Sequence, residues 1–322
     1  MKKGISVLIC TFNGSTRLAT TLNHLANQSV KSEVNWEVIV VDNASTDGTF
    51  EFVSHEWGKY CVPDVDFTIV REDMPGRNNA LAKGIHLCKY EYLINCDDDN
   101  WLSEEYLQLT YDLLDRHSHI GAVGGQAIAA TKSGLLPNWF DEYKAGYAVG
   151  QQGRESGDVT SRGFLFGAGM GTRTQLYIEL YKNFPSILIG RQGTVLSSGE
   201  DSEYCQRLLL RDYTLYYESQ LILKHYIPEE RLSVAFRERL FLGFEEAHEI
   251  LSEYYFLNKL RRKLRGNIMN KIRLLIISPI RFLLAPSAEK RAVQIKIIAY
   301  ILKIKNSSNP VFDAIHWFER EK

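Results

Sequence analysis

Residues 36–48 read WEVIVVDNASTDG, a run that is apolar except for Glu37 and that ends at Asp42 in a cluster of turn-forming residues. Such a run is typical of a strand that is buried on both faces of a parallel sheet. The arrangement recurs at residues 92–99, YLINCDDD, where an apolar run ends in three consecutive aspartates. Because ligands of parallel sheets bind at the carboxyl ends of the strands, we expect Asp42 and Asp97 at the ligand-binding edge.

Strand and helix patterns alternate outward from these two strands, through residues 1–125. Residues 5–10 and 67–70 are further short apolar strands, and the stretch 18–26 has the apolar spacing of an amphipathic helix. Alternation of this kind indicates right-handed βαβ units and a mainly parallel sheet. From residue 134 to residue 199 the pattern gives way to Gly, Ser and aromatic residues, which is typical of functional loops. The chain reads as helical beyond residue 239.

The charge balance is nearly neutral, with 38 Lys and Arg against 39 Asp and Glu, but it is uneven along the chain. Residues 258–305 contain thirteen Lys and Arg and one acid, Glu289, so this segment carries +12 and the rest carries −13. A composition of 45% hydrophobic and 24% charged residues in 322 excludes a disordered or fibrous chain.

The cysteine pattern and the amino-terminal segment indicate the cellular compartment in which the protein is expected. Five cysteines without CxxC spacing argue against a disulfide framework or a zinc ribbon and favour a reducing compartment. The short apolar run after Met1 is interpreted as a strand rather than a signal peptide, and no uninterrupted apolar stretch reaches about 18 residues. We therefore expect a cytoplasmic location.

The negative charges of the three carboxylates at residues 97–99 must be separated in solvent or balanced by a cation. Two unit charges about 4 Å apart repel by about 4 kcal/mol at an effective dielectric of about 20. Magnesium favours one or two carboxylates together with phosphate oxygens and water. In a strand-like tip Asp97 and Asp99 point the same way, and Asp98 turns aside. The triplet alone leaves two interpretations open, a divalent cation site and a solvated acidic turn.

Five segments resemble, in order and approximate spacing, the motifs of family 2 inverting glycosyltransferases of the bacterial surface-polysaccharide type. They are SVLICTFNGS, VIVVDNASTDGT, LINCDDDNWL, SSGEDSEYCQRL and LILKHYIPEERL, and they cover roughly residues 4–235. The resemblance implies a GT-A fold, that is, an α/β domain with a mainly parallel central sheet flanked by helices, here followed by a helical appendage. It also implies a hexosyltransferase-like enzyme that moves a sugar from a nucleotide-diphosphate donor, by default a UDP-sugar, to a saccharide or lipid-linked saccharide.

The resemblance implies roles for residues of the donor site. Asp42 matches the aspartate that contacts the base or ribose, and Thr11 and Asn13 match the loop that lines the same pocket. Asp97, with Asp98 beside it, matches the family residues that contact the ribose or the diphosphate of the donor.

The resemblance also implies roles for the motif residues at the leaving diphosphate, the metal and the acceptor hydroxyl. Arg77 in PGRNNALAKGI resembles the Arg-Asn pair that precedes the fourth strand and contacts the nucleotide. Asp99 would be a ligand of Mg²⁺ or Mn²⁺, with His225 near the metal or diphosphate. Asp201, preceded by Glu200, matches the base that takes the proton of the acceptor hydroxyl. One base suffices for a single displacement that inverts the anomeric configuration, unlike the paired carboxylates of glycosidases.

Three weaker candidates remain for the acceptor side or the lid: Glu200, next to Asp201, and Arg191 and Trp139 in the loop-rich region. Arg191 lies in the segment LIGRQGTVLSSG, residues 188–199. If this segment is a loop that closes over the substrates, Arg191 would meet a phosphate of the donor; the alternative is that the segment is a plain connector. Trp139 is interpreted either as a stacking surface for an acceptor sugar or as a packing aromatic.

The basic segment 258–305 has three interpretations. Basic amphipathic helices bind anionic membrane surfaces, and this function would place the protein on the cytoplasmic face of the membrane. The alternative is that the apolar side packs on the catalytic domain and the bases are solvated. Nucleic acid is not expected as a partner, because the aromatic residues of a single-strand binder are missing.

The predicted organisation is a catalytic domain at residues 1–238 and a helical basic region at 239–322. The catalytic domain divides into a nucleotide-binding half, 1–125, and an acceptor half, 126–238. A sugar-1-phosphate nucleotidyltransferase is disfavoured because CTFNGSTR lacks a Gly-rich basic phosphate loop. The remaining alternative is a non-catalytic, transferase-like module that binds saccharide or serves as a membrane-tethered scaffold.

Overall fold

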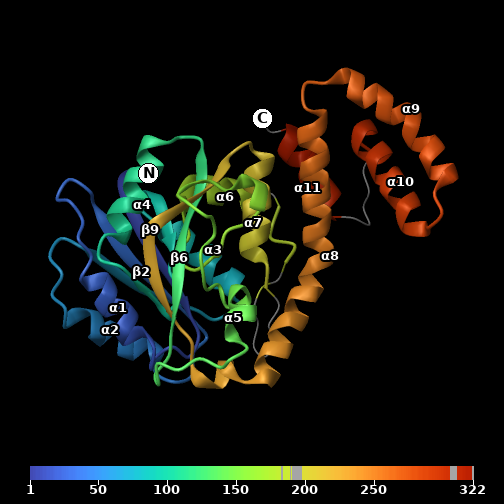
Figure 1. Cartoon of the computed structure of the whole chain (residues 1–322). Coiled ribbons are helices and arrows are strands. Elements are labelled where there is room, and N and C mark those ends of the chain that lie inside the picture. The colour runs from blue at the N-terminus through green and yellow to red at the C-terminus, as the bar shows by residue number, and fades with distance from the viewer. Residues whose placement is uncertain (183, 189, 191–197, 305–309, 321–322) are drawn as a thin grey trace. The chain divides into compact units, whose positions relative to one another are not determined.

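The structure is a computed structural model that describes residues 1–182, 184–188, 190, 198–304 and 310–320. The chain divides into two compact units, residues 1–247 and residues 248–322 (Figure 1). The first unit is an α/β domain, and the described residues of the second unit are mainly helical.

A single mixed sheet runs through the first unit. Its strands are β1 (Lys2–Thr11), β2 (Trp36–Asn43), β3 (Asp66–Glu72), β4 (Tyr90–Asn95), β5 (Asn100–Leu102), β6 (Ile120–Ala130), β7 (Gly157–Asp158), β8 (Gly171–Arg173) and β9 (Thr214–Tyr226). Within the described chain the strand order is β3-β2-β1-β4-β8-β6-β9-β5, and β7 also pairs with β9. The first four strands are parallel, whereas β8 runs antiparallel to β4 and β6.

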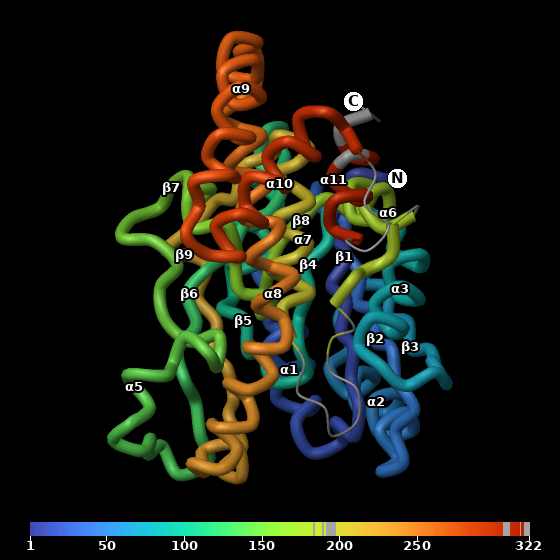
Figure 2. The backbone as a smooth tube through the Cα atoms, turned by 90° about the vertical axis from the view of Figure 1, so that its right-hand side faces the viewer, coloured from blue at the N-terminus to red at the C-terminus, as the bar shows by residue number. Residues whose placement is uncertain are grey.

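The helices of the first unit cover both faces of this sheet. They are α1 (Leu18–Ala26), α2 (Thr49–Gly58), α3 (Arg77–Leu87), α4 (Tyr106–Arg116), α5 (Phe140–Tyr143), α6 (Thr174–Lys182) and α7 (Glu200–Leu210), with the 3₁₀ turns η1 (Lys144–Tyr147), η2 (Thr160–Arg162) and η3 (Glu229–Leu232). Because side chains of a strand alternate between faces, Val7 and Ile9 of β1 pack in one buried cluster with α1, α2 and α4. Leu8 packs in another with α3, which lies beside β2 and β3 (Figure 2).

Four further helices follow: α8 (Val234–Leu264), α9 (Ile268–Leu284), α10 (Ala288–Leu302) and α11 (Pro310–Arg320). The predicted boundary at residue 238 falls inside α8, because this helix begins at Val234 in the first unit and continues into the second. No helix in the described part of the chain combines the length and the apolar character that a membrane span requires.

The predicted α/β class with a mainly parallel sheet is confirmed, but the sequence prediction overlooked β6, β8 and α6. The segment that forms β6 reads IGAVGGQAIAA, and its Gly and Ala residues mask the apolar run of a buried strand. Gly125 is required there, since a Cβ at this position would lie 2.0 Å from the carbonyl oxygen of Leu221 in β9. The apolar runs at residues 215–217 and 221–223 both belong to one continuous strand, β9.

Thiol reactivity is expected to be restricted to one cysteine. All five cysteines are free, and Cys61 is the exposed one. Burial raises the pKa of the Cys88 and Cys205 thiols to about 12, so their reactive thiolate forms are scarce near neutral pH. A thiol reagent at pH 8 should modify one cysteine rapidly in the native protein and all five after denaturation. Rapid loss of two or more thiols from the native protein would contradict this prediction.

Candidate active site

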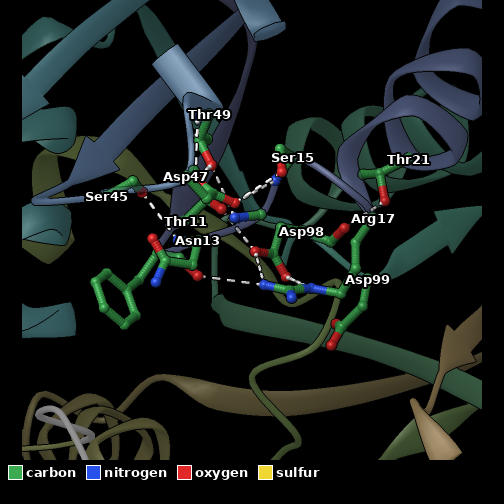
Figure 3. Close-up of polar contacts among 12 residues, drawn as sticks. Thr11, Asn13, Ser15, Arg17, Thr21, Ser45, Asp47, Thr49, Asp98 and Asp99 are labelled. Carbon is green, nitrogen blue, oxygen red and sulfur yellow. Dashed lines mark hydrogen bonds and ion pairs between the residues drawn. The ribbon is translucent and has the colours of Figure 1, made fainter.

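The loops that follow β1 and β2 are tied together by polar contacts at the carboxyl edge of the sheet (Figure 3). Asn13, in a left-handed conformation with φ 50°, donates its N–H to Ser45 Oγ at 2.9 Å, and its Oδ1 accepts the N–H of Thr46 at 2.9 Å. Asp47 accepts the N–H and the hydroxyl of Ser15 at 3.2 and 2.7 Å. These contacts give the β1–α1 loop a defined shape next to Asp42.

Asp98 turns toward the same loop (Figure 3). Its Oδ2 accepts the hydroxyl of Thr11 at 2.6 Å and Arg17 Nη2 at 2.7 Å, and its Oδ1 accepts Arg17 Nε at 3.1 Å. A two-point contact of this kind fixes both side chains in orientation. Asp98 and Thr11 therefore stabilise the β1–α1 loop together with Arg17, a residue that the sequence analysis did not identify.

The ends of β2 and β3 position the start of α3. Asp42 is 3% exposed, and its Oδ1 accepts the N–H of Ser45 at 3.3 Å. The neighbouring Asn43 accepts the N–H of Gly76 at 2.8 Å and donates Nδ2 to the carbonyl of Met74 at 2.7 Å. Asn43 thus holds the loop that leads directly into Arg77.

Arg77 brings together carboxylates from distant parts of the chain. Its guanidinium lies 3.5 Å from Asp97, 3.3 Å from Glu200 and 3.5 Å from Asp201, measured between nitrogen and carboxylate oxygen. Burial alone would lower the pKa of Arg77, but Asp201, Asp97 and Glu200 outweigh burial and raise it well above its ordinary value. A permanent positive charge therefore links the acidic triplet to the first turn of α7.

Asp201 lies directly over the backbone of Gly167. A Cβ added at Gly167 would lie 1.9 Å from Oδ2 of Asp201. Only glycine leaves room for the carboxylate at this point, which gives the segment GAGMG, residues 167–171, a structural reason for its composition.

Gly167→Ala is expected to lower the catalytic rate by about 10²-fold, since a displacement near 1 Å of a reacting group has an effect of that order. The folded state and nucleotide binding should persist, because the clash is confined to the Asp201 side chain. Gly58→Ala is the matched control, as nothing lies within 4 Å of its added Cβ. Steady-state rates and calorimetric nucleotide affinities measure both effects; an unchanged rate in Gly167→Ala would show that the position of Asp201 is not critical.

Asp99 and His225 meet because β5 pairs with β9. The register aligns Asn100 with His225, and the N–H of Tyr226 donates to the carbonyl of Asp99 at 2.8 Å. His225 Nε2 lies 3.3 Å and Arg231 Nη1 3.2 Å from the Asp99 carboxylate. Burial would raise the pKa of Asp99, but His225 and Arg231 hold it below its ordinary range.

This arrangement fits a divalent cation shared with a substrate phosphate. Among the described residues no group of three or more His, Cys, Asp and Glu side chains is placed to hold a metal by itself. Mg²⁺ commonly takes only one or two carboxylates and completes its shell with substrate phosphates and water. Asp99 is held ionised, and Nδ1 of His225 is buried without a hydrogen-bond partner in the structure. The ionised Asp99 carboxylate suits a cation site, whereas Asp99 raises the pKa of His225, and His225 can be a ligand only as the neutral imidazole.

Of the weaker acceptor-side candidates, Glu200 joins this cluster through Arg77, and Trp139 does not. The ring of Trp139 packs among aromatic side chains, with Tyr143 at 6.2 Å between centroids, and the Arg237 guanidinium lies 5.0 Å from its centre. Arg191 lies outside the described residues.

A fully buried ion pair, which the sequence analysis did not anticipate, supports the start of α7. Glu203 and Arg207 are 2.6 Å apart and neither side chain is exposed. Glu203 accepts the N–H of Ile187 at 3.1 Å and that of Leu188 at 3.1 Å, and Arg207 donates to the carbonyl of Pro185 at 2.9 Å. The pair therefore anchors residues 185–188 to the helix that carries Asp201.

The sequence profile of the family described as "Glycosyl transferase family 2" matches residues 6–166, which is half of the chain. A putative glycosyltransferase, EpsH of Bacillus subtilis, is 27% identical over 104 residues, 32% of this chain and 28% of that protein. A poly-β-1,6-N-acetyl-D-glucosamine synthase of Staphylococcus aureus is 24% identical over 259 residues, 79% of this chain and 57% of that protein. The matched segments thus span less than two thirds of these relatives.

Two solved structures share the fold. S. aureus TarS 1–349 in complex with UDP-GlcNAc has a TM-score of 0.53 and 18% identity, covering 99% of this chain and 91% of that chain. The mannosyltransferase PcManGT from Pyrobaculum calidifontis, in complex with GDP-Man and Mn²⁺, has a TM-score of 0.55 and 17% identity, covering 99% and 88%.

The family profile covers the chain from within β1 to beyond β7, and this part includes the strand ends that carry Asp42 and the acidic triplet. The structural neighbours extend the same fold through α7 and β9, where Asp201 and His225 lie. The chain therefore belongs to glycosyl transferase family 2 and has the GT-A fold.

Proposed function

We propose that the chain is a metal-dependent inverting glycosyltransferase that moves a sugar from a UDP-sugar to a saccharide or lipid-linked saccharide. The observation that carries this proposal is the partly buried Arg77, which lies within 3.5 Å of both Asp97 on the donor side and Asp201 on α7. A donor phosphate near Asp97 would then lie close to the candidate base. The UDP-GlcNAc complex of TarS supports a nucleotide-sugar donor.

The donor site in this proposal is the carboxyl edge of β1, β2 and β4. Asp42 contacts the base or ribose, and the loop shaped by Thr11 and Asn13 lines the same pocket. Asp97 and Arg77 face the ribose and diphosphate. Asp98 acts through Arg17 and Thr11 by fixing the loop, so its contribution to donor binding is positional.

The proposed transfer is a single displacement with Asp201 as the base. As the acceptor oxygen forms a bond to the anomeric carbon, Asp201 takes the hydroxyl proton. The bond from that carbon to the diphosphate oxygen breaks on the opposite face, which inverts the anomeric configuration. The nucleoside diphosphate leaves with the bonding electron pair, and the proton remains on Asp201.

Asp99 and His225 are the residues that would hold Mg²⁺ or Mn²⁺. When bound, the cation supplies positive charge to the leaving diphosphate without proton transfer. The Mn²⁺ complex of PcManGT supports metal use in a protein of this fold. Arg77 and Arg231 lie beside Asp97 and Asp99 and add fixed positive charge on the protein side.

We expect metal-dependent binding of one nucleotide. Calorimetric titration with UDP, GDP and dTDP, each with Mn²⁺ and with EDTA, should show binding of UDP that weakens strongly in EDTA. Asp99→Ala should lose the metal-dependent part of the UDP affinity. Asp201→Asn should keep it, because in this proposal Asp201 faces the acceptor. Absence of binding to all three nucleotides with Mn²⁺ would contradict the donor-site assignment and favour a non-catalytic saccharide-binding module.

Association with the cytoplasmic face of a membrane through residues 258–305 belongs to the same proposal. The +12 charge of this segment is suited to an anionic surface. A lipid-linked acceptor would be presented to the enzyme at such a surface.

A further inference from the structure

Helix α9 exposes one continuous apolar face. Seven apolar side chains of this helix are between 45% and 78% exposed: Ile268, Met269, Ile272, Ile276, Ile280, Leu283 and Leu284. Their spacing of three and four residues places them along one side of the helix for its whole length. A stripe of this extent is larger than the scattered exposed apolar residues of an ordinary surface.

The exposed stripe is separate from the side of α9 that packs. Ser278 is fully buried, and Leu274, Leu275 and Phe282 are partly buried on that side. Helix α10 lies alongside α9 within the second unit (Figure 1). Internal packing of this unit therefore uses one side of α9 and leaves the seven-residue stripe uncovered by the described residues of the unit.

The charges on α9 are all positive. Its 17 residues include Lys271, Arg273 and Arg281, all exposed, and no Asp or Glu. Arg262, Lys263 and Arg265 add three exposed bases at the preceding helix end. An apolar stripe accompanied only by bases matches an interfacial helix that lies in the plane of an anionic bilayer.

The same charges argue against a second copy of the chain on this face. In a symmetric contact through α9 both helices would contribute only bases, without an acidic partner from the facing helix, and like charges across an interface are unfavourable. A bilayer that contains anionic lipid supplies both apolar chains for the stripe and phosphates for the bases.

We propose that α9 is the membrane-contacting element of this protein, with Ile272, Ile276 and Ile280 inserted between lipid chains and Lys271, Arg273 and Arg281 at the lipid phosphates. This inference rests on the proposed membrane association and is independent of the proposed transfer. Vesicle binding and UDP binding therefore test the two separately.

The experiment is co-sedimentation of the full-length protein with phosphatidylcholine vesicles, with and without phosphatidylglycerol. The protein should bind the anionic vesicles, and the triple variant I272E/I276E/I280E should bind at least about tenfold more weakly. The triple variant K271Q/R273Q/R281Q should also bind more weakly and lose most of its salt dependence. Both variants should keep wild-type UDP affinity.

The matched control is I128E/L135E/L136E, which places three glutamates at exposed apolar positions of the first unit. It should bind vesicles as the wild type does. The inference is overturned if the wild type ignores anionic vesicles, or if I272E/I276E/I280E binds them unchanged. A wild-type dimer that I272E/I276E/I280E converts to a monomer, with no vesicle binding by either protein, would also overturn it in favour of a second copy on this face.

Discussion

Asp201→Asn is expected to lower the rate of sugar transfer by roughly 10²- to 10⁴-fold, the usual contribution of a general base. The amide has nearly the shape of the carboxylate, so it should still fit against Gly167, but it cannot take the acceptor proton. Arg77 retains Asp97 and Glu200 as partners, which should preserve the fold of the site. The measurement is release of nucleoside diphosphate in the presence of donor, acceptor and Mn²⁺.

Asp141→Asn is the matched control for this substitution. The Asp141 side chain is 91% exposed and forms a surface salt bridge with Lys144, so the transfer rate should not change. Calorimetry should give equal UDP affinities for the two variants and the wild type. Full activity in Asp201→Asn would assign the base to another residue.

Glu203→Gln is expected to cost about 3–5 kcal/mol of unfolding free energy, since it removes one member of a fully buried ion pair. Arg207 would keep its charge without the carboxylate at 2.6 Å, and one of the two oxygens that accept the N–H groups of residues 187 and 188 would become an NH2 donor. Urea unfolding followed by circular dichroism measures this loss. Because the pair anchors the approach to α7, activity should fall with stability.

Asp112→Asn provides the comparison for a surface pair. Asp112 and Arg116 also lie four residues apart on a helix, α4, at 3.0 Å, but Arg116 is 68% exposed. Exposed pairs of this spacing contribute about 0.3–0.5 kcal/mol. The double variant Glu203→Gln with Arg207→Met should be more stable than Glu203→Gln alone, because it removes the uncompensated buried charge. Equal losses at the two sites would contradict the assignment of the buried pair as an anchor.

Local sequence patterns predicted some residues of the site and missed the contacts between them. Asp42 and Asp97 could be assigned to one edge of the sheet because each follows an apolar strand, and parallel strands end at the same edge. The partners of Arg77 could not be assigned in this way. Glu200 is 123 residues away in sequence, and only the packing of α7 beside the sheet brings it within 3.3 Å.

The basic segment shows the same division. Its charge of +12 is a property of composition, visible in the sequence alone. Which apolar residues of α9 pack and which are exposed depends on where α10 lies, so the stripe appears only in the structure.

The sequence by itself determined the α/β class, the succession of the first four strands along the chain and the family, since these depend on periodicity, strand ends and motif order. The tertiary structure alone decided that Asp98 pairs with Arg17, that Asp99 meets His225 through the β5–β9 register, and that Gly167 makes room for Asp201. The physical reason is that a side chain's partner is set by strand register and helix packing between distant segments, whereas a strand or helix is set largely by its own neighbours.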